Sequence, residues 1–422
     1  MSVAMSNSLE WHLSPVAESG RNCEFEEHRR CDLRRTLPTP AILLLIIAAG
    51  CGSDSEDPVS PPNSSDPCSS PSTICVPSEA PTIQAGIDAA SAGDTVLVAP
   101  GTYYEHDIQL QPAVTLMSQA GPEGTTIDAL YSGSGIIGAE GAAVVGFTIM
   151  SSGGLNTAGV YCYEVSILML NNVLLDHAYA AVKLIYSASE IRGNEIHVDP
   201  VTHFAAESVT SWGGSPLIAE NVIYDTDPNG NSSAVELNYP SPDEPSDTVV
   251  CDNVIYGRVW ISGGGVTDPI EVRHNLIVVE NGYSSAINMA SVGEQTLIVN
   301  NTLVGGGLFL QGGSSPTISK NIIAFAREGI ESWGGSVSLS CNDLWENEQD
   351  YAGIDPGMDD FSEDPLFCLD DNPAGPYSLH ANSPCLPQTS PCGELVGAFG
   401  AGCNPTTPAE GKPWSAIKAI YR

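Results

Sequence analysis

The chain contains little positive charge. Its 422 residues include 14 Lys and Arg against 51 Asp and Glu, which gives a formal net charge of −37. A surface this acidic repels the phosphates of nucleic acids, so we expect no nucleic acid partner. It tolerates metal cations and neutral or basic ligands. Neutral glycans meet this condition, whereas a polyanion needs a bridging cation.

Several catalytic signatures are missing as well. The sequence has no Gly-x-Ser-x-Gly elbow, no phosphate-binding glycine loop and no basic tract. Its His and Cys residues do not have the spacing of metal ligands. These absences argue against an elbow-type serine hydrolase, a P-loop nucleotide enzyme and a zinc site, and they leave the catalytic residues unknown.

The amino-terminal apolar run, Ala41 to Ala49, is too short to span a bilayer comfortably. It is preceded by Arg29, Arg30, Arg34 and Arg35 and followed by Gly50 and Cys51, an arrangement typical of an export signal. The small residues before Cys51 resemble a bacterial lipobox, which implies cleavage before Cys51 and lipidation of its thiol. An ordinary secretory signal or a short anchor helix is the alternative. We expect an exported monomer held at the outer membrane or cell surface of a bacterium by its lipid anchor alone.

A repeat organises the middle of the chain. Each copy has an Asn, an aliphatic residue two positions later and an apolar residue three positions earlier, and successive copies are 20 to 32 residues apart. The asparagines are Asn172, Asn194, Asn221, Asn253, Asn275, Asn301, Asn321 and Asn342. Such a period predicts a solenoid, here of roughly ten coils, in which aliphatic residues stack inside at about 4.8 Å per coil. The asparagines then form a structural ladder at a tight turn.

A second pattern, two small residues and then an aliphatic one, predicts another strand in every coil. The residue after the aliphatic one faces outward, and these residues form one file: Tyr161, Lys183, Thr210, Glu236, Trp260, Asn288, Phe309 and Glu331. Trp212 and Trp333 precede Gly-Gly-Ser turns and extend one rim of the file. Sugars bind aromatic faces together with carboxylates or amides, so we interpret these ten residues as ligand-binding for a polysaccharide or another cell-surface component. The alternative is that the aromatic side chains simply cover a pleated face.

The start of the repeat region carries a family resemblance. Ile83, Ile87 and Ala90 fall on one helical face, and strand signals with a Pro-Gly turn follow. This stretch resembles the amino-terminal cap of pectin-lyase-like right-handed parallel β-helix proteins. The resemblance implies that the helix plugs the open end of the solenoid.

We therefore expect an all-β fold: a single-stranded right-handed parallel β-helix with an N-terminal capping helix and an irregular, Cys-rich C-terminal cap. The expected organisation is a signal region over 1–50, a disordered tether over 51–77, the β-helix over 78–345, the C-terminal cap over 346–403, and a linker with a short amphipathic tail over 404–422. The tail is either a docking or sorting signal or a segment packed on the cap.

Cysteine spacing supports an exported protein. Cys68 and Cys75 are spaced for a small disulfide loop. The cysteines available to staple the cap, in a connectivity that the sequence leaves open, are Cys341, Cys368, Cys385, Cys392 and Cys403. Nine cysteines follow Cys51, so at least one of them stays unpaired.

One loop matches a calcium-binding pattern. Residues 225–236 fit the Asp-x-Asp-x-Asn-Gly spacing, with Glu at the twelfth position. The candidate metal ligands are Asp225, Asp227, Asn229, Asn231 and Glu236. Pro228 and the absence of flanking helices depart from an EF-hand, so a polar turn is the alternative. Calcium is the one candidate cofactor.

The resemblance also raises an enzymatic alternative. Pectate lyases of this kind use calcium to neutralise a uronate and an Arg or Lys to abstract a proton. Lys183 and Glu236 lie two coils apart, roughly 10 Å, which leaves room for a sugar. A Lys base needs its pKa lowered by burial or by a cationic neighbour, and the sequence shows neither, so we expect an exposed Lys183. The Gly-His-Gly and Arg-x-Lys motifs of polygalacturonases are absent. We expect a non-catalytic surface protein, with a calcium-dependent polysaccharide lyase or related carbohydrate-active enzyme as the alternative.

Overall fold

The computed structural model describes residues 67–154, 156–198, 207–225, 232–239, 247–263, 269–280, 285–368 and 377–403. All of them belong to one compact unit, Ser53–Arg422. The expectations for the signal region, for Cys51 and for the tail fall outside the described residues. Among the described helices, none has the length and apolar character needed to cross a membrane.

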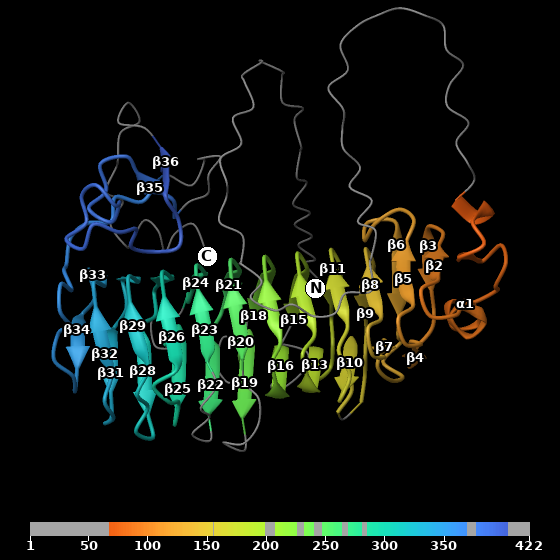
Figure 1. Cartoon of the computed structure of the whole chain (residues 1–422), viewed down its shortest axis with the longest axis horizontal. Coiled ribbons are helices and arrows are strands. Elements are labelled where there is room, and N and C mark those ends of the chain that lie inside the picture. Colours follow the sequence, from red (N-terminus) through yellow and green to blue (C-terminus); the bar gives the residue numbers. More distant parts are fainter. Residues whose placement is uncertain are drawn as a thin grey trace, which may run out of the picture. The chain divides into compact units, whose positions relative to one another are not determined.

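Three parallel sheets wind through the described chain as a right-handed β-helix (Figure 1). Sheet A has twelve strands in the order β1 (Thr73–Val76), β2 (Thr95–Val98), β5 (Thr115–Ser118), β8 (Ala143–Val145), β11 (Leu168–Leu170), β14 (Glu190–Arg192), β17 (Leu217–Ala219), β20 (Thr248–Cys251), β23 (Ile270–Arg273), β26 (Thr296–Val299), β29 (Thr317–Ser319) and β32 (Ser338–Ser340).

Sheets B and C have eleven strands each. Sheet B contains β3 (Gly101–Tyr103), β6 (Thr125–Asp128), β9 (Thr148–Met150), β12 (Val173–Leu175), β15 (Glu195–Val198), β18 (Val222–Asp225), β21 (Val254–Tyr256), β24 (Leu276–Val278), β27 (Thr302–Val304), β30 (Ile322–Ala324) and β33 (Asp343–Trp345). Sheet C contains β4 (Ile108–Gln109), β7 (Ile136–Ile137), β10 (Val160–Tyr163), β13 (Ala180–Ser187), β16 (Glu207–Gly214), β19 (Val235–Tyr239), β22 (Val259–Gly263), β25 (Ile287–Ala290), β28 (Leu308–Gln311), β31 (Glu328–Ser332) and β34 (Gln349–Ala352).

The core of the solenoid is built by vertical stacking of one residue per strand. In sheet B, for example, Ile196, Ile223 and Ile255 are register partners in successive coils, and each is fully buried. One buried aliphatic side chain contributes about 1.5 to 3 kcal/mol, so a coil is stable only when neighbours cover both of its faces. The solenoid has about twelve coils, more than the ten expected. The expected number was too low because the first coils lack the asparagine that marks the repeat.

The asparagine ladder lies at the corner between sheets A and B. Each Asn donates its backbone N–H and its Nδ2–H to the Oδ1 of the next, as Asn172 does to Asn194 at 2.9 and 3.0 Å. At the last step, Asn342 donates both groups to Oδ1 of Asp360, at 2.8 and 3.0 Å. A carboxylate therefore ends a ladder of amides, because the last coil needs an acceptor and no further donor.

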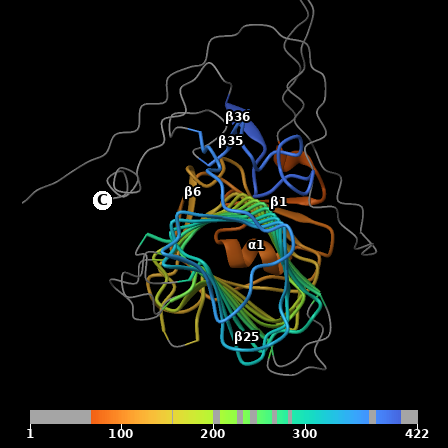
Figure 2. The ribbon, with the colours of Figure 1, turned by 90° about the vertical axis from the view of Figure 1, so that its left-hand side faces the viewer.

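The N-terminal helix α1 (Ile83–Ala89) covers the first coil, and in Figure 2 it lies within the outline of the coils. Ile83 and Ile87 are fully buried, and the Thr82 side chain caps the helix by accepting from the Ala85 N–H at 3.1 Å. The solenoid begins before residue 78, where the tether was expected to end. Residues 73–76 form β1, because Ile74 and Val76 add one more apolar layer beside β2.

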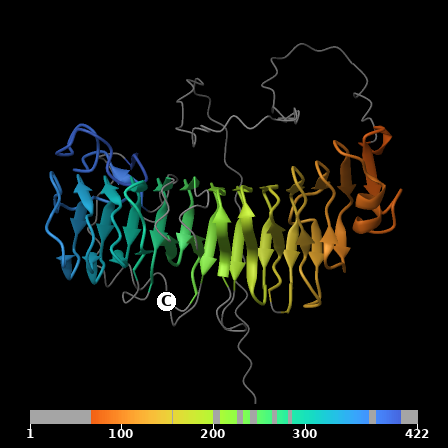
Figure 3. The ribbon, with the colours of Figure 1, turned by 60° about the horizontal axis from the view of Figure 1, so that its bottom comes forward.

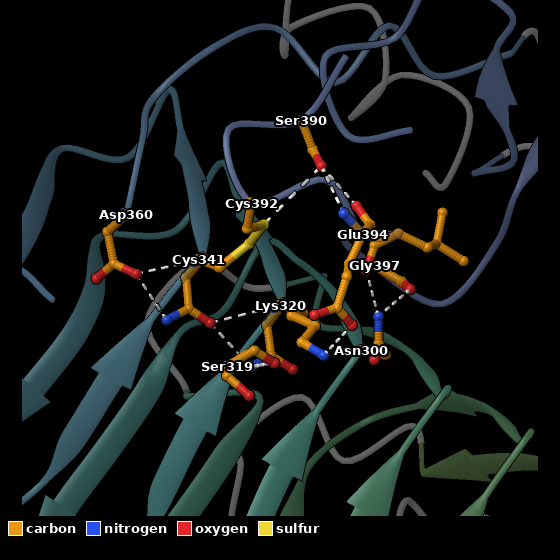
Figure 4. Close-up of a disulfide and its surroundings, with 12 residues drawn as sticks. Asn300, Ser319, Lys320, Cys341, Asp360, Ser390, Cys392, Glu394 and Gly397 are labelled. Carbon is orange, nitrogen blue, oxygen red and sulfur yellow. Dashed lines mark hydrogen bonds and ion pairs between the residues drawn. A yellow bond between two sulfur atoms is a disulfide. The ribbon is translucent and has the colours of Figure 1, made fainter. Parts of the chain in front are cut away.

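The C-terminal region packs on the outer flank of the last coils, at the A–B corner. This region contains the strand pair β35 (Leu379–His380) and β36 (Ala401–Cys403), which ends the described chain. The described chain begins, at the other end, with a short 3-10 turn, η1 (Pro67–Ser69). Figure 4 shows the disulfide that joins Cys341, in the last coils, to Cys392. Beside it, Asn300 Nδ2 donates to the Leu395 carbonyl at 2.6 Å. The partly buried side chains of Tyr351 and Ile354 pack against the end of the core.

The structure defines three disulfides among the described residues. The expected loop disulfide joins Cys68 and Cys75, and Cys368 pairs with Cys403. Cys251 is also disulfide-bonded. Cys162 and Cys385 are buried free thiols. Of the five cysteines expected to staple the C-terminal region, Cys385 alone does not, because its thiol lies 3.1 Å from the Asp343 carboxylate instead.

Candidate functional site: the outer face of sheet C

The outward file predicted from the sequence is a continuous row on sheet C. Each of its residues is the register partner of the next, from Tyr161 in β10 to Glu331 in β31. Figure 3 turns this side of the solenoid forward. The row is less open than expected, because Lys183, Thr210 and Asn288 are 7%, 2% and 8% exposed. The other five residues are partly buried.

Trp212 and Trp333 lie at equivalent positions, two residues beyond Thr210 and Glu331. Their side chains are 47% and 68% exposed. The Trp333 ring meets Phe309 edge to face at 4.9 Å, and its Nε1 donates to Glu331 Oε1 at 2.7 Å. The two tryptophans are five coils apart, or about 24 Å.

Lys183 is buried rather than exposed, which corrects the expectation from the sequence. Its ammonium group lies 4.7 Å from the centre of the Tyr179 ring and 5.9 Å from that of Tyr161, and it donates to Asn156 Oδ1 at 3.3 Å. The long stem of a lysine packs well over aromatic rings. Burial lowers the pKa of Lys183, and the negative charge of Glu207 partly opposes this effect.

A carboxyl pair lies beside Lys183. Glu207 in β16 is hydrogen-bonded to Glu236 in β19, and Thr210 Oγ1 donates to Glu236 at 3.2 Å. Burial, then the hydrogen bond and the charge of Glu236, raise the pKa of Glu207 to about 9. Glu207 is a residue of the site that was not predicted from the sequence. The sequence did contain a signal for it: a charged residue stands at a position where the preceding coil has the small residue Ala180, the register partner of Glu207.

The calcium-loop prediction is only partly covered by the structure. Asp227, Asn229 and Asn231 lie outside the described residues. Asp225 Oδ1 accepts from Ser232 Oγ at 2.6 Å, and Glu236 contacts Glu207 and Thr210. Among the described residues, no group of three or more His, Cys, Asp or Glu side chains is arranged to hold a metal ion. The calcium site stays a prediction.

Most Lys and Arg side chains in the described part of the chain form ion pairs. Arg192, Arg273, Lys320 and Arg327 all form ion pairs with glutamates. In the described ranges, Lys183 and Arg258 are the two Lys or Arg side chains without a carboxylate within ion-pair distance. Lys183 belongs to the sheet C file, and Arg258 lies beside it. The Arg258 guanidinium lies 5.8 Å from the Trp260 ring centre, and its Nε donates to Ser233 Oγ at 3.2 Å.

A second aromatic row lies on the outer face of sheet B but has a different geometry. The rings of His197, Tyr224 and Tyr256 stack on one another, with centroids 4.2 and 4.9 Å apart and interplanar angles of 12° and 6°. The ring faces therefore contact each other and are not available to a ligand. The exposed tryptophans of sheet C leave ring surface free, so sheet C is the better candidate for binding a sugar.

No protein-family model and no curated protein sequence matches the chain. Solved structures do match. The mannuronan C-5 epimerase AlgE4 A-module of Azotobacter vinelandii has 17% identity and a TM-score of 0.44, with 67% of this chain and 95% of that one covered. Pectate lyase Pel9A has 14% identity and a TM-score of 0.44, with 75% of this chain and 90% of that one covered.

A third match is XylC in complex with xylose, at 12% identity and a TM-score of 0.43, with 64% of this chain covered. This chain spans only 56% of XylC. At these identities the similarities concern the fold alone. The three parallel sheets of the chain itself confirm the expected architecture, a right-handed parallel β-helix.

Proposed function

We propose that this protein is an exported, lipid-anchored surface protein that binds a glycan or another surface component along the outer face of sheet C, without converting it. The observation that carries the proposal is the pair Trp212 and Trp333. These two exposed rings occupy the same register position and enclose a row of polar and aromatic side chains between them. Ring faces combined with amide and carboxylate groups provide the chemistry that holds sugars.

Binding of the full mature protein to a panel of soluble polysaccharides, measured by affinity electrophoresis and calorimetry, tests this proposal. The double variant Trp212→Ala and Trp333→Ala should lose at least about tenfold in affinity. Tyr104→Ala is the matched control, because Tyr104 is 66% exposed and follows sheet B instead. Equal affinity in the double variant, or no binding to any polysaccharide, contradicts the proposal.

Export and lipid anchoring are part of the same proposal. The disulfides Cys68–Cys75, Cys341–Cys392 and Cys368–Cys403 support an oxidising compartment outside the cytoplasm. Cys51 is the proposed lipidation site. Expression in a bacterium fed a labelled fatty acid should label the wild type and leave Cys51→Ala unlabelled. Equal labelling of both proteins removes the anchor from the proposal.

A calcium-dependent polysaccharide lyase is the second candidate, and the burial of Lys183 favours it. A lysine acts as a base only when its neutral form is accessible, and burial lowers the pKa of Lys183 in that direction. Incubation with calcium and a panel of uronate polymers, followed by ultraviolet absorbance of new unsaturated ends, tests this candidate. Activity that disappears in Lys183→Ala replaces the non-catalytic proposal. No activity on any uronate removes the second candidate.

Calcium at the loop of residues 225–236 belongs to this second candidate. The double variant Asp225→Ala and Asp227→Ala should lower the melting temperature only when calcium is present, because the wild type alone gains stability from the bound ion. Identical wild-type melting temperatures with and without calcium remove the site.

A further inference from the structure

Asn288, in the middle of sheet C, has a buried acceptor that receives no hydrogen bond. Its neighbours in β25, Ile287 and Met289, are fully buried in the core, so strand alternation turns Asn288 to the outer face. Its side chain is 8% exposed, and no donor in the described ranges reaches its Oδ1. A buried acceptor without a partner costs folding free energy, so one that is retained points to a donor from outside the chain.

The residues on either side of Asn288 suit a sugar. Its register partners are Trp260 in β22 and Phe309 in β28, about 4.8 Å away on each side. Both aromatic side chains are partly exposed. An apolar ring on each side of one hydrogen-bond acceptor fits a molecule with apolar faces and a hydroxyl group between them.

Charged groups of both signs flank this triad. Arg258 lies over Trp260 at one end, at 5.8 Å, and Glu236 is the register partner of Trp260 at the same end. Glu331 is the register partner of Phe309 at the other end, and the Trp333 indole holds its carboxylate at 2.7 Å. A ligand of either sign spanning Trp260, Asn288 and Phe309 meets at least one like charge. An uncharged ligand meets neither penalty.

We propose that Trp260, Asn288 and Phe309 form a subsite for a neutral sugar ring, one hydroxyl of which donates to Asn288 Oδ1. This inference rests on the proposed glycan-binding function and specifies its ligand class. It distinguishes the site from one that recognises uronates through their carboxylates.

Calorimetry with three neutral polymers (xylan, mixed-linkage β-glucan and galactomannan) and three charged ones (polygalacturonate, alginate and chitosan) tests the ligand class. The wild type should bind at least one neutral polymer. Asn288→Leu should weaken that binding about tenfold, the effect of one lost hydrogen bond, and should raise the melting temperature because it removes the unsatisfied acceptor. Asn288→Ala, which is too small to clash, should show the same loss of binding. Asn171→Gly, at an exposed site before the asparagine ladder, is the control.

The outcomes separate this inference from the proposed function. Neutral-polymer binding that is unchanged in both Asn288 variants overturns the subsite and leaves the glycan-binding face in place. Binding of charged polymers alone overturns the neutral class. A melting temperature lowered in Asn288→Leu assigns Asn288 a structural role and overturns the subsite. Absence of binding to all six polymers overturns both proposals.

Discussion

Glu207 and Glu236, in neighbouring coils of sheet C, are hydrogen-bonded to each other through their carboxyl groups. Two carboxylates in contact repel strongly when both are ionised, so one of them keeps a proton. Burial is the largest cause that raises the pKa of Glu207 to about 9, and the hydrogen bond and the charge of Glu236 add to it. At neutral pH the pair therefore contains a protonated acid, and it lies near Lys183.

This pair predicts a pH-dependent stability. The pKa of Glu207 is about 9 in the folded chain against 4.5 for the free group, so the folded state binds the extra proton between these values. Stability then falls as pH rises from about 4.5 to 9. Glu207→Gln removes this titration. The melting temperature of the variant, relative to that of the wild type, should therefore rise progressively as the pH increases across that range. Thermal unfolding from pH 5 to 9.5 measures the gain, with Glu331→Gln as the control. A constant difference between Glu207→Gln and wild type contradicts the shared proton.

The buried carboxylate of Asp343 leads us to expect a similar pH-dependent stability at the C-terminal region. Its carboxylate is fully buried, accepts from the Glu363 N–H at 3.0 Å and contacts the Cys385 thiol. Burial raises its pKa from 3.8 to about 7. Stability therefore falls between pH 4 and 7, and Asp343→Asn should add up to about 4 kcal/mol at pH 8 and almost nothing at pH 4.

Denaturant unfolding at the two pH values measures the effect of Asp343→Asn. The exposed Asp355→Asn is the control, and it should behave like the wild type at both values. A loss of stability in Asp343→Asn at pH 8 shows that the ionised carboxylate is needed, which is the opposite of the expectation.

The asparagine ladder predicts a large cost for one substitution at its centre. Asn253 Oδ1 accepts from the N–H and the Nδ2 of Asn221, and its own Nδ2 donates to the Ile218 carbonyl and to Asn275. Asn253→Ala leaves these buried groups without partners and should cost about 3 kcal/mol. Urea unfolding measures it, with Asn171→Gly expected within about 0.5 kcal/mol of wild type. A loss below about 1 kcal/mol in Asn253→Ala shows that the ladder does not hold the corner.

The close packing of α1 on the first coil at Gly86 leads to a prediction about stability. A Cβ at this position lies 2.9 Å from methyl groups of both Val76 and Val96. Gly86→Ala should therefore destabilise the fold by about 1 to 3 kcal/mol, although alanine is the better helix former by about 1 kcal/mol. Thermal unfolding measures the change. Ala89→Gly, on the exposed side of the helix, should cost only its propensity, about 1 kcal/mol. A more stable Gly86→Ala contradicts the close contact between α1 and the sheet.

Much of the fold could be predicted from the sequence because the constraint is local and repeated. Asn194 and Asn221, with an aliphatic residue two positions later, specify both the corner and the inward layer of each coil. The outward file followed from strand alternation, and Lys183, Thr210 and Glu236 are indeed consecutive register partners. The number of coils was underestimated because the first coils contain no ladder asparagine.

The candidate site was less predictable because it depends on burial that alternation does not encode. The sequence placed Lys183 in solvent, whereas the rings of Tyr179 and Tyr161 bury it. The sequence marks Glu207 as a charged residue at a position where the preceding coil has Ala180, but it does not show that the Glu207 side chain reaches Glu236. In the same way, the sequence gives no sign that Asn288 lacks a donor.

A crystal structure of the full mature protein soaked with a neutral oligosaccharide tests the central claim most directly. We expect sugar rings over sheet C, between Trp212 and Trp333, with a hydroxyl group within hydrogen-bond distance of Asn288 Oδ1. Sugar bound only on sheet A, on sheet B or on the C-terminal region contradicts the assignment of the binding face to sheet C.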